Sequence, residues 1–225
     1  MNIDYQKHPL PKRLRHHTSP NLYLPIDELK LASDFYPPVY SSIDWKEHFA
    51  DGKPPNVLDV GCGKGSLLLN YSSNYPDENI LGVELRPGPV NWLEKIIQSE
   101  QIDNCSVIWY SVVNGLSFIE DNSIAKIIYL FPDPWTKRKH QKRRAFDMDF
   151  LKECWRVLRQ NGLLFLATDI IKVDVYQKKI LKEHNGYSLK VMDNGEEWEL
   201  PVSNKEKFCR EYNVPFFRTI CQKKI

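Results

Sequence analysis

The sequence predicts an α/β protein with a mostly parallel sheet and helices on both of its faces. Beyond residue 55, short and continuous apolar runs alternate with amphipathic stretches of helical period. A continuous apolar run of this length is typical of a strand that is buried on both faces, as in parallel sheets. The intervening helical patterns then supply the crossovers of βαβ units. A chain of 225 residues has room for one such domain around one core.

The elements follow one another in a regular order. Apolar runs predict strands over 56–60, 80–85, 105–110, 124–131 and 163–169, and the stretches between them predict helices over 65–75, 89–100 and 146–160. The tail predicts a closing pair of strands within 188–193 and 216–224. Asp147 can cap the start of the helix over 146–160, and Gly162 is predicted to lie just past its end. The apolar face of this helix combines Phe150, Leu151, Cys154, Val157 and Leu158.

The first fifty residues have a different character. Residues 1–50 are rich in proline, histidine and aromatic side chains and show no period, which predicts an N-terminal arm and lead-in segment ahead of one domain over 51–225. The basic stretch "KRLRHH", over 12–17, is open to two interpretations, a phosphate contact or a disordered arm.

Composition and charge exclude several classes of protein. The apolar runs are too short to span a bilayer and the N-terminus has no apolar signal segment, which favours a cytoplasmic location and no membrane attachment. Five scattered cysteines without a C-x-x-C pair favour reduced thiols over a disulfide framework or a zinc site. We expect no metal site, because His140 and the pair His16–His17 have no second cluster of ligands. A net charge of +2 allows a local basic surface only.

A glycine loop follows the first predicted strand and opens a helix. In "DVGCGKG", over 59–65, the residues Gly61, Gly63 and Gly65 permit a tight turn and a close approach to a ligand. The spacing is neither that of a phosphate-binding P-loop nor that of a dinucleotide fold. It is the D-x-G-x-G-x-G signature of S-adenosylmethionine (SAM) methyltransferases. Asp59 is placed to meet the ammonium of that ligand, and Glu84, at the end of the next strand, to accept bonds from ribose hydroxyls.

A strongly basic run follows the fourth predicted strand. The block "FPDPWTKRKHQKRR", over 131–144, places six Lys and Arg within 137–144, directly after a Pro-Asp-Pro-Trp turn. Ligands of open α/β sheets bind at the carboxyl ends of the strands, where this turn lies. We therefore expect the basic side chains to neutralise the phosphates of a nucleic acid. Trp135 is expected to pack the turn or to stack on a base. The phosphate contacts are predicted at Arg138, Lys142, Arg143 and Arg144.

This block resembles the signature of the bacterial tRNA (guanine-N7)-methyltransferases, and the resemblance extends from about residue 56 to the C-terminus. It implies a Rossmann-like class I fold with a seven-stranded sheet, SAM as cofactor, and methylation of guanosine N7 in the variable loop of tRNA. Asp133 matches the acid with the catalytic role, beside the cofactor. The resemblance implies cofactor contacts at Asp59 and Glu84, and guanosine or tRNA contacts at Lys137, Asp169, Ser203 and Glu206.

The sequence departs from the family pattern at three positions. Leu130 stands where an asparagine is usual, Ser111 stands where an acid usually approaches the adenine, and Ser203 replaces a threonine. Ser111 is retained as a predicted cofactor contact. Two other functions stay open, a SAM methyltransferase for small molecules and a non-catalytic RNA-binding subunit of the same fold. The sequence also leaves open whether the protein is a monomer or a homodimer.

Overall fold

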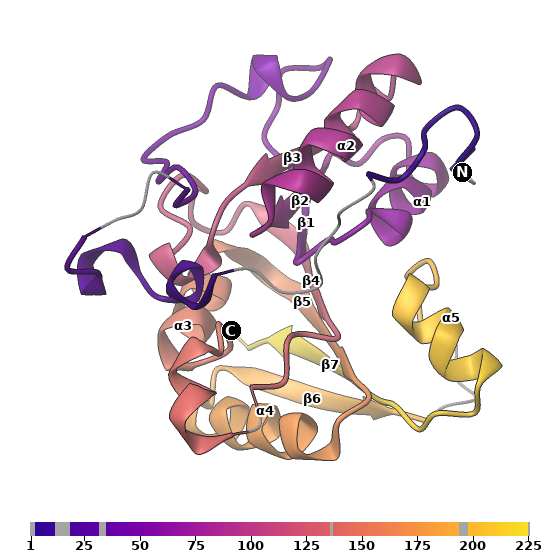
Figure 1. Cartoon of the computed structure of the whole chain (residues 1–225). Helices are drawn as coiled ribbons and strands as arrows, with labels where there is room; N and C mark the ends of the chain where they lie inside the picture. Colours follow the sequence, from indigo (N-terminus) through magenta and orange to yellow (C-terminus); the bar gives the residue numbers. More distant parts are fainter. Residues whose placement is uncertain (1–2, 12–18, 32–34, 136, 194–197, 225) are drawn as a thin grey trace.

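The structure is a computed structural model that describes residues 3–11, 19–31, 35–135, 137–193 and 198–224 (Figure 1). Its strands are β1 Val57–Val60, β2 Ile80–Glu84, β3 Cys105–Trp109, β4 Ile124–Leu130, β5 Leu158–Thr168, β6 Tyr187–Met192 and β7 Phe217–Lys223. Its α-helices are α1 Ser66–Asn74, α2 Pro87–Ser99, α3 Met148–Val157, α4 Ile171–His184 and α5 Asn204–Glu211. Short 3-10 helices cover Pro20–Tyr23, Ile26–Glu28, Trp45–Glu47, Val112–Asn114 and Arg138–Arg143.

The strands form one seven-stranded sheet in the order β3-β2-β1-β4-β5-β7-β6. The pairs among β1 to β5 are parallel, and β7 runs antiparallel to both of its neighbours. The predicted fold class and the closing pair of strands are therefore confirmed. The strand order reverses between β1 and β4, and this is the place at which open α/β sheets form a ligand crevice beyond the carboxyl ends of the strands.

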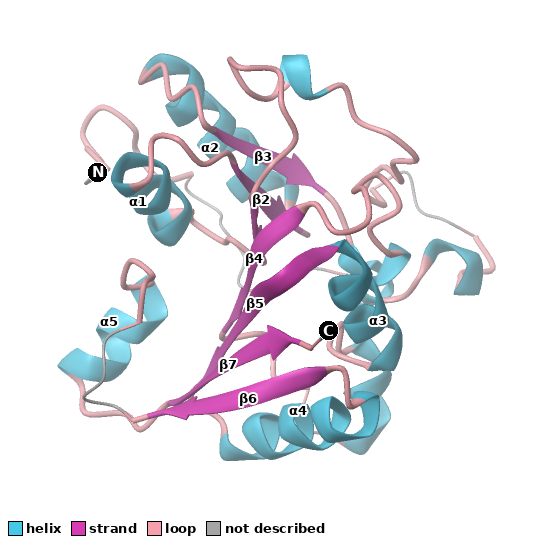
Figure 2. Cartoon of the chain, turned by 180° about the vertical axis from the view of Figure 1, so that it is seen from behind, coloured by secondary structure: helices cyan, strands magenta, loops and turns pink. Residues whose placement is uncertain are grey.

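Two layers of helices enclose the sheet, as Figures 1 and 2 show from opposite sides. Side chains of α3 and α4 pack on one face, against residues such as Leu58 and Leu81. Side chains of α1 and α2 pack on the other face, against residues such as Val57 and Ile80, and the segment before α5 adds Trp198 there. Neighbouring strand residues point to opposite faces, so a strand covered on both sides must be apolar throughout. This explains why the continuous runs predicted the parallel strands correctly.

The helix predicted over 146–160 differs from the structure at its C-terminal end. Its N-cap is confirmed, because the Asp147 carboxylate accepts the backbone N–H of Phe150 at 2.9 Å. However, α3 ends at Val157, and Leu158 already pairs with Ile124 of β4. The prediction that Gly162 lies just past the end of the helix is wrong, because Gly162 lies inside β5, within an irregularity in the pairing of β5 with β4. A Cβ at Gly162 would come within 2.8 Å of the carbonyl oxygen of Arg159, so the glycine serves this bulge.

The described parts of the N-terminal segment pack against the rest of the chain. Phe49 joins the core cluster on the α3 and α4 face, and Leu22 and Tyr36 are buried. Further upstream, Lys7 and His8 both contact the carboxylate of Glu100 at 2.7 Å, next to the C-terminal end of α2. The basic stretch over 12–17, with His16 and His17, lies outside the described residues.

Candidate active site

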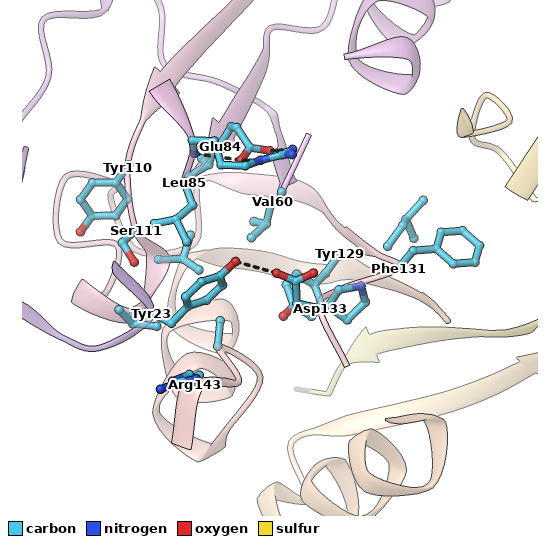
Figure 3. A pocket seen from close by; sticks show the side chains of 18 of the residues that line it. Tyr23, Val60, Glu84, Leu85, Tyr110, Ser111, Tyr129, Phe131, Asp133 and Arg143 are labelled. Carbon is cyan, nitrogen blue, oxygen red and sulfur yellow. Dashed lines mark hydrogen bonds and ion pairs between the residues drawn. The ribbon is translucent and has the colours of Figure 1, made fainter. Parts of the chain in front are cut away.

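A pocket lies at the carboxyl ends of the central strands, where the strand order reverses (Figure 3). Its walls come from the ends of β1 and β2, from the segment after β3, from the loop after β4 and from one residue of the N-terminal segment. Among the residues that line it are Tyr23, Gly61, Glu84, Ser111, Asp133 and Arg143. The structure therefore brings three predicted cofactor residues, Gly61, Glu84 and Ser111, together with the predicted catalytic acid, whereas Asp59, Gly63 and Gly65 do not line the pocket.

The glycine loop has the backbone geometry that only glycine adopts without strain. Gly61, Gly63 and Gly65 have φ angles of 79°, 58° and 69°, in the left-handed region. At the start of α1, a Cβ on Gly65 would overlap the side chain of Leu93, so a larger residue here requires the Leu93 side chain to move. The loop turns its backbone toward β2, because the N–H of Gly63 donates to Oε2 of Glu84 at 2.9 Å.

Glu84 is buried at the end of β2 and is paired with Arg86. Its Oε1 accepts from both the backbone N–H and the Nε of Arg86, at 2.9 and 2.8 Å. Its Oε2 also accepts from Nη2 of Arg86 at 3.1 Å. Each carboxylate oxygen can accept two hydrogen bonds, so the bonds from Arg86 and Gly63 orient the group and fill its acceptor sites. A ligand that offers hydroxyl donors can bond to Glu84 by replacing bonds from the Arg86 guanidinium. The sequence analysis did not identify Arg86 as the partner of Glu84.

Asp59 is buried beneath the glycine loop. Its Oδ2 has no hydrogen-bond partner within the described residues. Burial, and secondly the charge of Glu84, raise the pKa of Asp59 to about 7. A buried carboxylate without a compensating partner is costly to ionise, and a cationic ligand group would remove that cost. Asp59 does not itself line the pocket, but the carboxylates of Asp59 and Glu84 together suit a ligand with both a cationic group and hydroxyl groups.

The raised pKa of Asp59 gives a prediction for stability. The folded protein binds this proton more tightly than the unfolded chain, in which an aspartate titrates near 3.9, so Asp59 should lower the free energy of unfolding as pH rises from about 4 to about 7. At pH 8 the free energy of unfolding of Asp59→Asn should therefore exceed that of the wild type by roughly 2–4 kcal/mol, which raises its urea midpoint. At pH 4 the two urea midpoints should be similar. Asp149→Asn, at an exposed position of α3, is the matched control. Equal urea midpoints for the wild type and Asp59→Asn at pH 8 would contradict the raised pKa of Asp59.

The loop that carries Asp133 has a strained backbone. Phe131 and Trp135 have φ angles of 50° and 36°, which are unusual for residues other than glycine. Between them, the rings of Pro132 and Pro134 restrict the chain further. Non-glycine residues in this region cost of order 1–3 kcal/mol each and persist where the surroundings hold them. The loop thus presents Asp133 to the pocket on a stiff support.

Aromatic and basic side chains hold this loop in place. The ring of Trp135 meets the ring of Tyr23 edge-on at 4.9 Å and lies 5.2 Å from the guanidinium of Arg143. Arg144 donates to the carbonyl oxygens of Pro134 and Trp135, both at 3.2 Å. These contacts favour the packing interpretation of Trp135 over a base-stacking one. Arg144 was predicted as a phosphate contact, but its guanidinium already donates two hydrogen bonds to the Asp133 loop.

The other members of the basic run are placed differently. Lys137 and Lys142 are exposed, and Arg143 is half-buried in the pocket wall. The side chain of Arg138 lies outside what the structure describes. The run therefore offers at least two exposed ammonium groups immediately next to the Asp133 loop.

The predicted substrate residues at the far end of the chain do not line the pocket. Asp169, directly after β5, is paired with Lys205 of α5 at 2.7 Å. Ser203 caps α5 by accepting the N–H of Glu206 at 3.2 Å. Glu206 itself is fully buried, with its Oε1 bonded to Arg210 at 2.7 Å. In this structure Ser203 and Glu206 anchor α5, and their roles in substrate binding stay predictions.

Ser111 lies in the pocket wall, but its hydroxyl faces the N-terminal segment. Its Oγ donates to the carbonyl oxygen of Leu22 at 2.9 Å, and both residues are buried. The next residue, Tyr23, donates its hydroxyl to Oδ2 of Asp133 at 2.6 Å. The sequence analysis missed Tyr23, because an aperiodic segment gives no signal for a contact that spans 110 positions.

Solved structures with a similar fold define the class. The aminoglycoside resistance methyltransferase NpmB1 matches with a TM-score of 0.57 at 14% identity, over 76% of this chain and 87% of that one. A SAM-dependent methyltransferase from Aquifex aeolicus matches with a TM-score of 0.52 at 17% identity, over 76% and 82%. Together with the glycine loop and Glu84, this fold is that of the class I methyltransferases.

The chain belongs to the putative methyltransferase family whose model matches residues 53–218. The tRNA (guanine-N(7)-)-methyltransferase of Kluyveromyces lactis is 30% identical over 182 residues, which cover 73% of this chain and 64% of that protein. The protein of the same name from Buchnera aphidicola is 32% identical over 136 residues, covering 60% and 57%. The chain spans less than two thirds of the length of these relatives. The resemblance drawn from the basic block is confirmed.

Among the residues that the structure describes, no helix has the length and apolar character needed to cross a membrane. The same residues include no group of three or more His, Cys, Asp or Glu that could hold a metal ion.

Proposed function

We propose that this protein transfers the methyl group of SAM to N7 of a guanosine in the variable loop of tRNA. The observation that carries the proposal is the position of Asp133 in the wall of the pocket that the glycine loop and Glu84 also form, with exposed Lys137 and Lys142 close by in the chain. The relatives named tRNA (guanine-N(7)-)-methyltransferase support the same reaction. A cytoplasmic setting, where tRNA is modified, agrees with five free cysteines.

The chain has residues suited to the ammonium group and to the ribose of SAM. Asp59 supplies a buried carboxylate with a free oxygen for the ammonium group, which offsets the cost of ionising it. Glu84 supplies acceptors for the ribose hydroxyls, which would replace bonds from the Arg86 guanidinium. The left-handed glycines let the backbone of the loop approach the ligand closely. Bound SAM supplies an electrophilic methyl group on a positively charged sulfur.

The residues around the base have a limited chemical task. Guanine N7 carries a lone pair and no proton, so the enzyme needs no general base for it. The protein has to align N7 with the methyl group and to stabilise the positive charge that the purine gains. The Asp133 carboxylate suits both tasks, because it attracts that charge and accepts hydrogen bonds from N–H donors of the base. The stiff loop from Phe131 to Trp135 fixes where it can do so.

The proposal is tested by incubating the protein with SAM and unmodified tRNA and analysing the nucleosides by mass spectrometry. We expect 7-methylguanosine, located in the variable loop by nuclease mapping. Methylation of small guanine compounds with no dependence on phosphates would favour the small-molecule enzyme instead. SAM binding without any product on a full set of unmodified tRNAs would reject the proposal.

The exposed lysines of the basic run give a second prediction. The double substitution Lys137→Ala with Lys142→Ala should weaken tRNA binding and reduce the slope of log affinity against log salt by about 0.7–0.9 for each phosphate that the variant no longer neutralises. SAM affinity should stay within a factor of about two, since neither side chain lines the pocket. Lys179→Ala with Lys182→Ala removes the same charge from the second half of α4, toward the opposite edge of the sheet, and should leave the slope unchanged. Identical slopes for both double variants would mean that the basic run is only a solvated surface.

A further inference from the structure

Tyr23 makes a short hydrogen bond to the predicted catalytic group. Its hydroxyl lies 2.6 Å from Oδ2 of Asp133, and both residues line the pocket (Figure 3). Its ring packs edge-on against Trp135, on the same loop as Asp133. Burial, and secondly the bond to Asp133, raise the pKa of Tyr23 above its ordinary value, so the phenol keeps its proton and acts as the donor. The contact is therefore an O–H donated to a carboxylate, a strong type of hydrogen bond.

The segment around Tyr23 is anchored independently of Asp133. On one side, the buried hydroxyl of Ser111 holds the carbonyl oxygen of Leu22. On the other side, the hydroxyl of Tyr36 donates to the carbonyl oxygen of Leu24 at 2.8 Å. Asn114 accepts the backbone N–H of Ile26 at 2.9 Å. These bonds fix Tyr23 to the loop after β3, so its hydroxyl is a stationary donor in the pocket.

We propose that Tyr23 is a positioning residue, which holds the carboxylate of Asp133 in the orientation that the target guanine requires. The inference rests on the proposed function. The Asp133 carboxylate has acceptor sites for about four hydrogen bonds, and Tyr23 takes one of them on Oδ2. With one oxygen held, rotation of the carboxyl group is restricted. This anchor comes from the N-terminal segment and is therefore separate from the loop that carries Asp133.

The energetic consequence falls on turnover more than on binding. A charge that stabilises a transition state works best when it is oriented beforehand, and a misplacement of about 1 Å can cost a hundredfold in rate. A hydrogen bond to a charged group is worth about a tenfold change or more. Removing the hydroxyl of Tyr23 should therefore lower kcat, while the cofactor contacts at Asp59 and Glu84 keep their geometry.

The test uses Tyr23→Phe, which keeps the ring against Trp135 and removes only the donor. We expect kcat at saturating SAM and tRNA to fall about tenfold, with KM for SAM within a factor of about two. Tyr5→Phe is the matched control, since it removes another phenol of the N-terminal segment, whose ring stacks on Trp92 and does not line the pocket. Its kcat should stay within a factor of about two. Equal losses in Tyr23→Phe and Tyr5→Phe would overturn the proposal, because the effect would then belong to the packing of the N-terminal segment.

A double-mutant cycle shows whether Tyr23 acts through Asp133. In the Asp133→Ala background, followed in single-turnover reactions, adding Tyr23→Phe should change the rate by less than about twofold. A further tenfold loss there would overturn the proposal, because Tyr23 would be acting on its own. Urea unfolding of the same four proteins measures the coupling of the pair without any turnover. Additive effects on unfolding would equally count against a bond that orients Asp133.

The results that would reject the proposed function differ from those that would reject the role of Tyr23. A wild-type protein that makes no 7-methylguanosine rejects that function and with it the role of Tyr23. A wild-type protein that makes 7-methylguanosine, and a Tyr23→Phe variant of equal kcat, rejects the role of Tyr23 alone.

Discussion

Asp133→Ala is expected to lower turnover at saturating tRNA by at least about a hundredfold while SAM affinity changes by no more than a few-fold. The reason is the position of the carboxylate. It is carried by a stiff loop beyond β4 and is bonded to Tyr23, whereas Glu84 and Gly61 line the side of the pocket that we propose for the cofactor. Single-turnover methylation measured by mass spectrometry, with calorimetry of SAM binding, separates the two effects.

The control for this variant is Asp149→Ala, which removes a carboxylate from an exposed position of α3. It should retain wild-type turnover. If Asp133→Ala turned over tRNA at a near-normal rate, the catalytic assignment would be wrong even if the protein were a methyltransferase. A large loss of SAM affinity in Asp133→Ala would instead indicate that Asp133 mainly binds the cofactor.

Gly65→Ala is expected to destabilise the fold by about 2–5 kcal/mol. Two costs add up at this position. The backbone φ of 69° places a side chain in the left-handed region, at a cost of about 1–2 kcal/mol. In addition, the new methyl group would overlap the side chain of Leu93 in the core between α1 and α2, and overpacking of this kind costs about 1–3 kcal/mol.

Gly61→Ala separates these two costs. Its φ of 79° is equally left-handed, but an added Cβ would meet no atom within 4 Å. We expect Gly61→Ala to cost only the backbone contribution of about 1–2 kcal/mol. Urea denaturation of both variants measures the difference. Equal destabilisation would show that the Leu93 side chain moves away without cost, and that the close packing of α1 against α2 is not a constraint on this glycine.

Much of the fold could be predicted from the sequence, because burial on two faces leaves a strong pattern. The runs that became β1, β2 and β4 are apolar at almost every position, as a strand between two helical layers has to be. The error at Gly162 has a physical cause. A glycine after an amphipathic stretch usually marks a helix end, but here Leu158 enters the sheet first and the glycine serves a bulge in β5.

The site could be predicted only in part. Asp59, Glu84 and Asp133 each follow or end a strand, and the carboxyl ends of parallel strands meet at one edge, so a motif at each end predicts a shared pocket. Contacts that depend on an irregular segment leave no such pattern. Tyr23 reaches the pocket from the N-terminal segment, and Arg86 neutralises Glu84 from two positions further along. The bond between Glu206 and Arg210 is an i,i+4 pair that the sequence shows, but the burial of Glu206 is a tertiary effect with no local signal.

The anchoring of the N-terminal segment matters for how the protein can be divided into parts. The family model begins at residue 53, which suggests a natural place to shorten the chain. The seven strands and five α-helices described above lie beyond that point. Yet a chain shortened there would lose Phe49 from the core and Leu22 from its bond with Ser111, and Tyr23 would leave the pocket wall. The sheet with its helices is thus a smaller unit than the one that forms the pocket, and grafts or circular permutations that are meant to retain the pocket need to keep the chain from residue 19 attached.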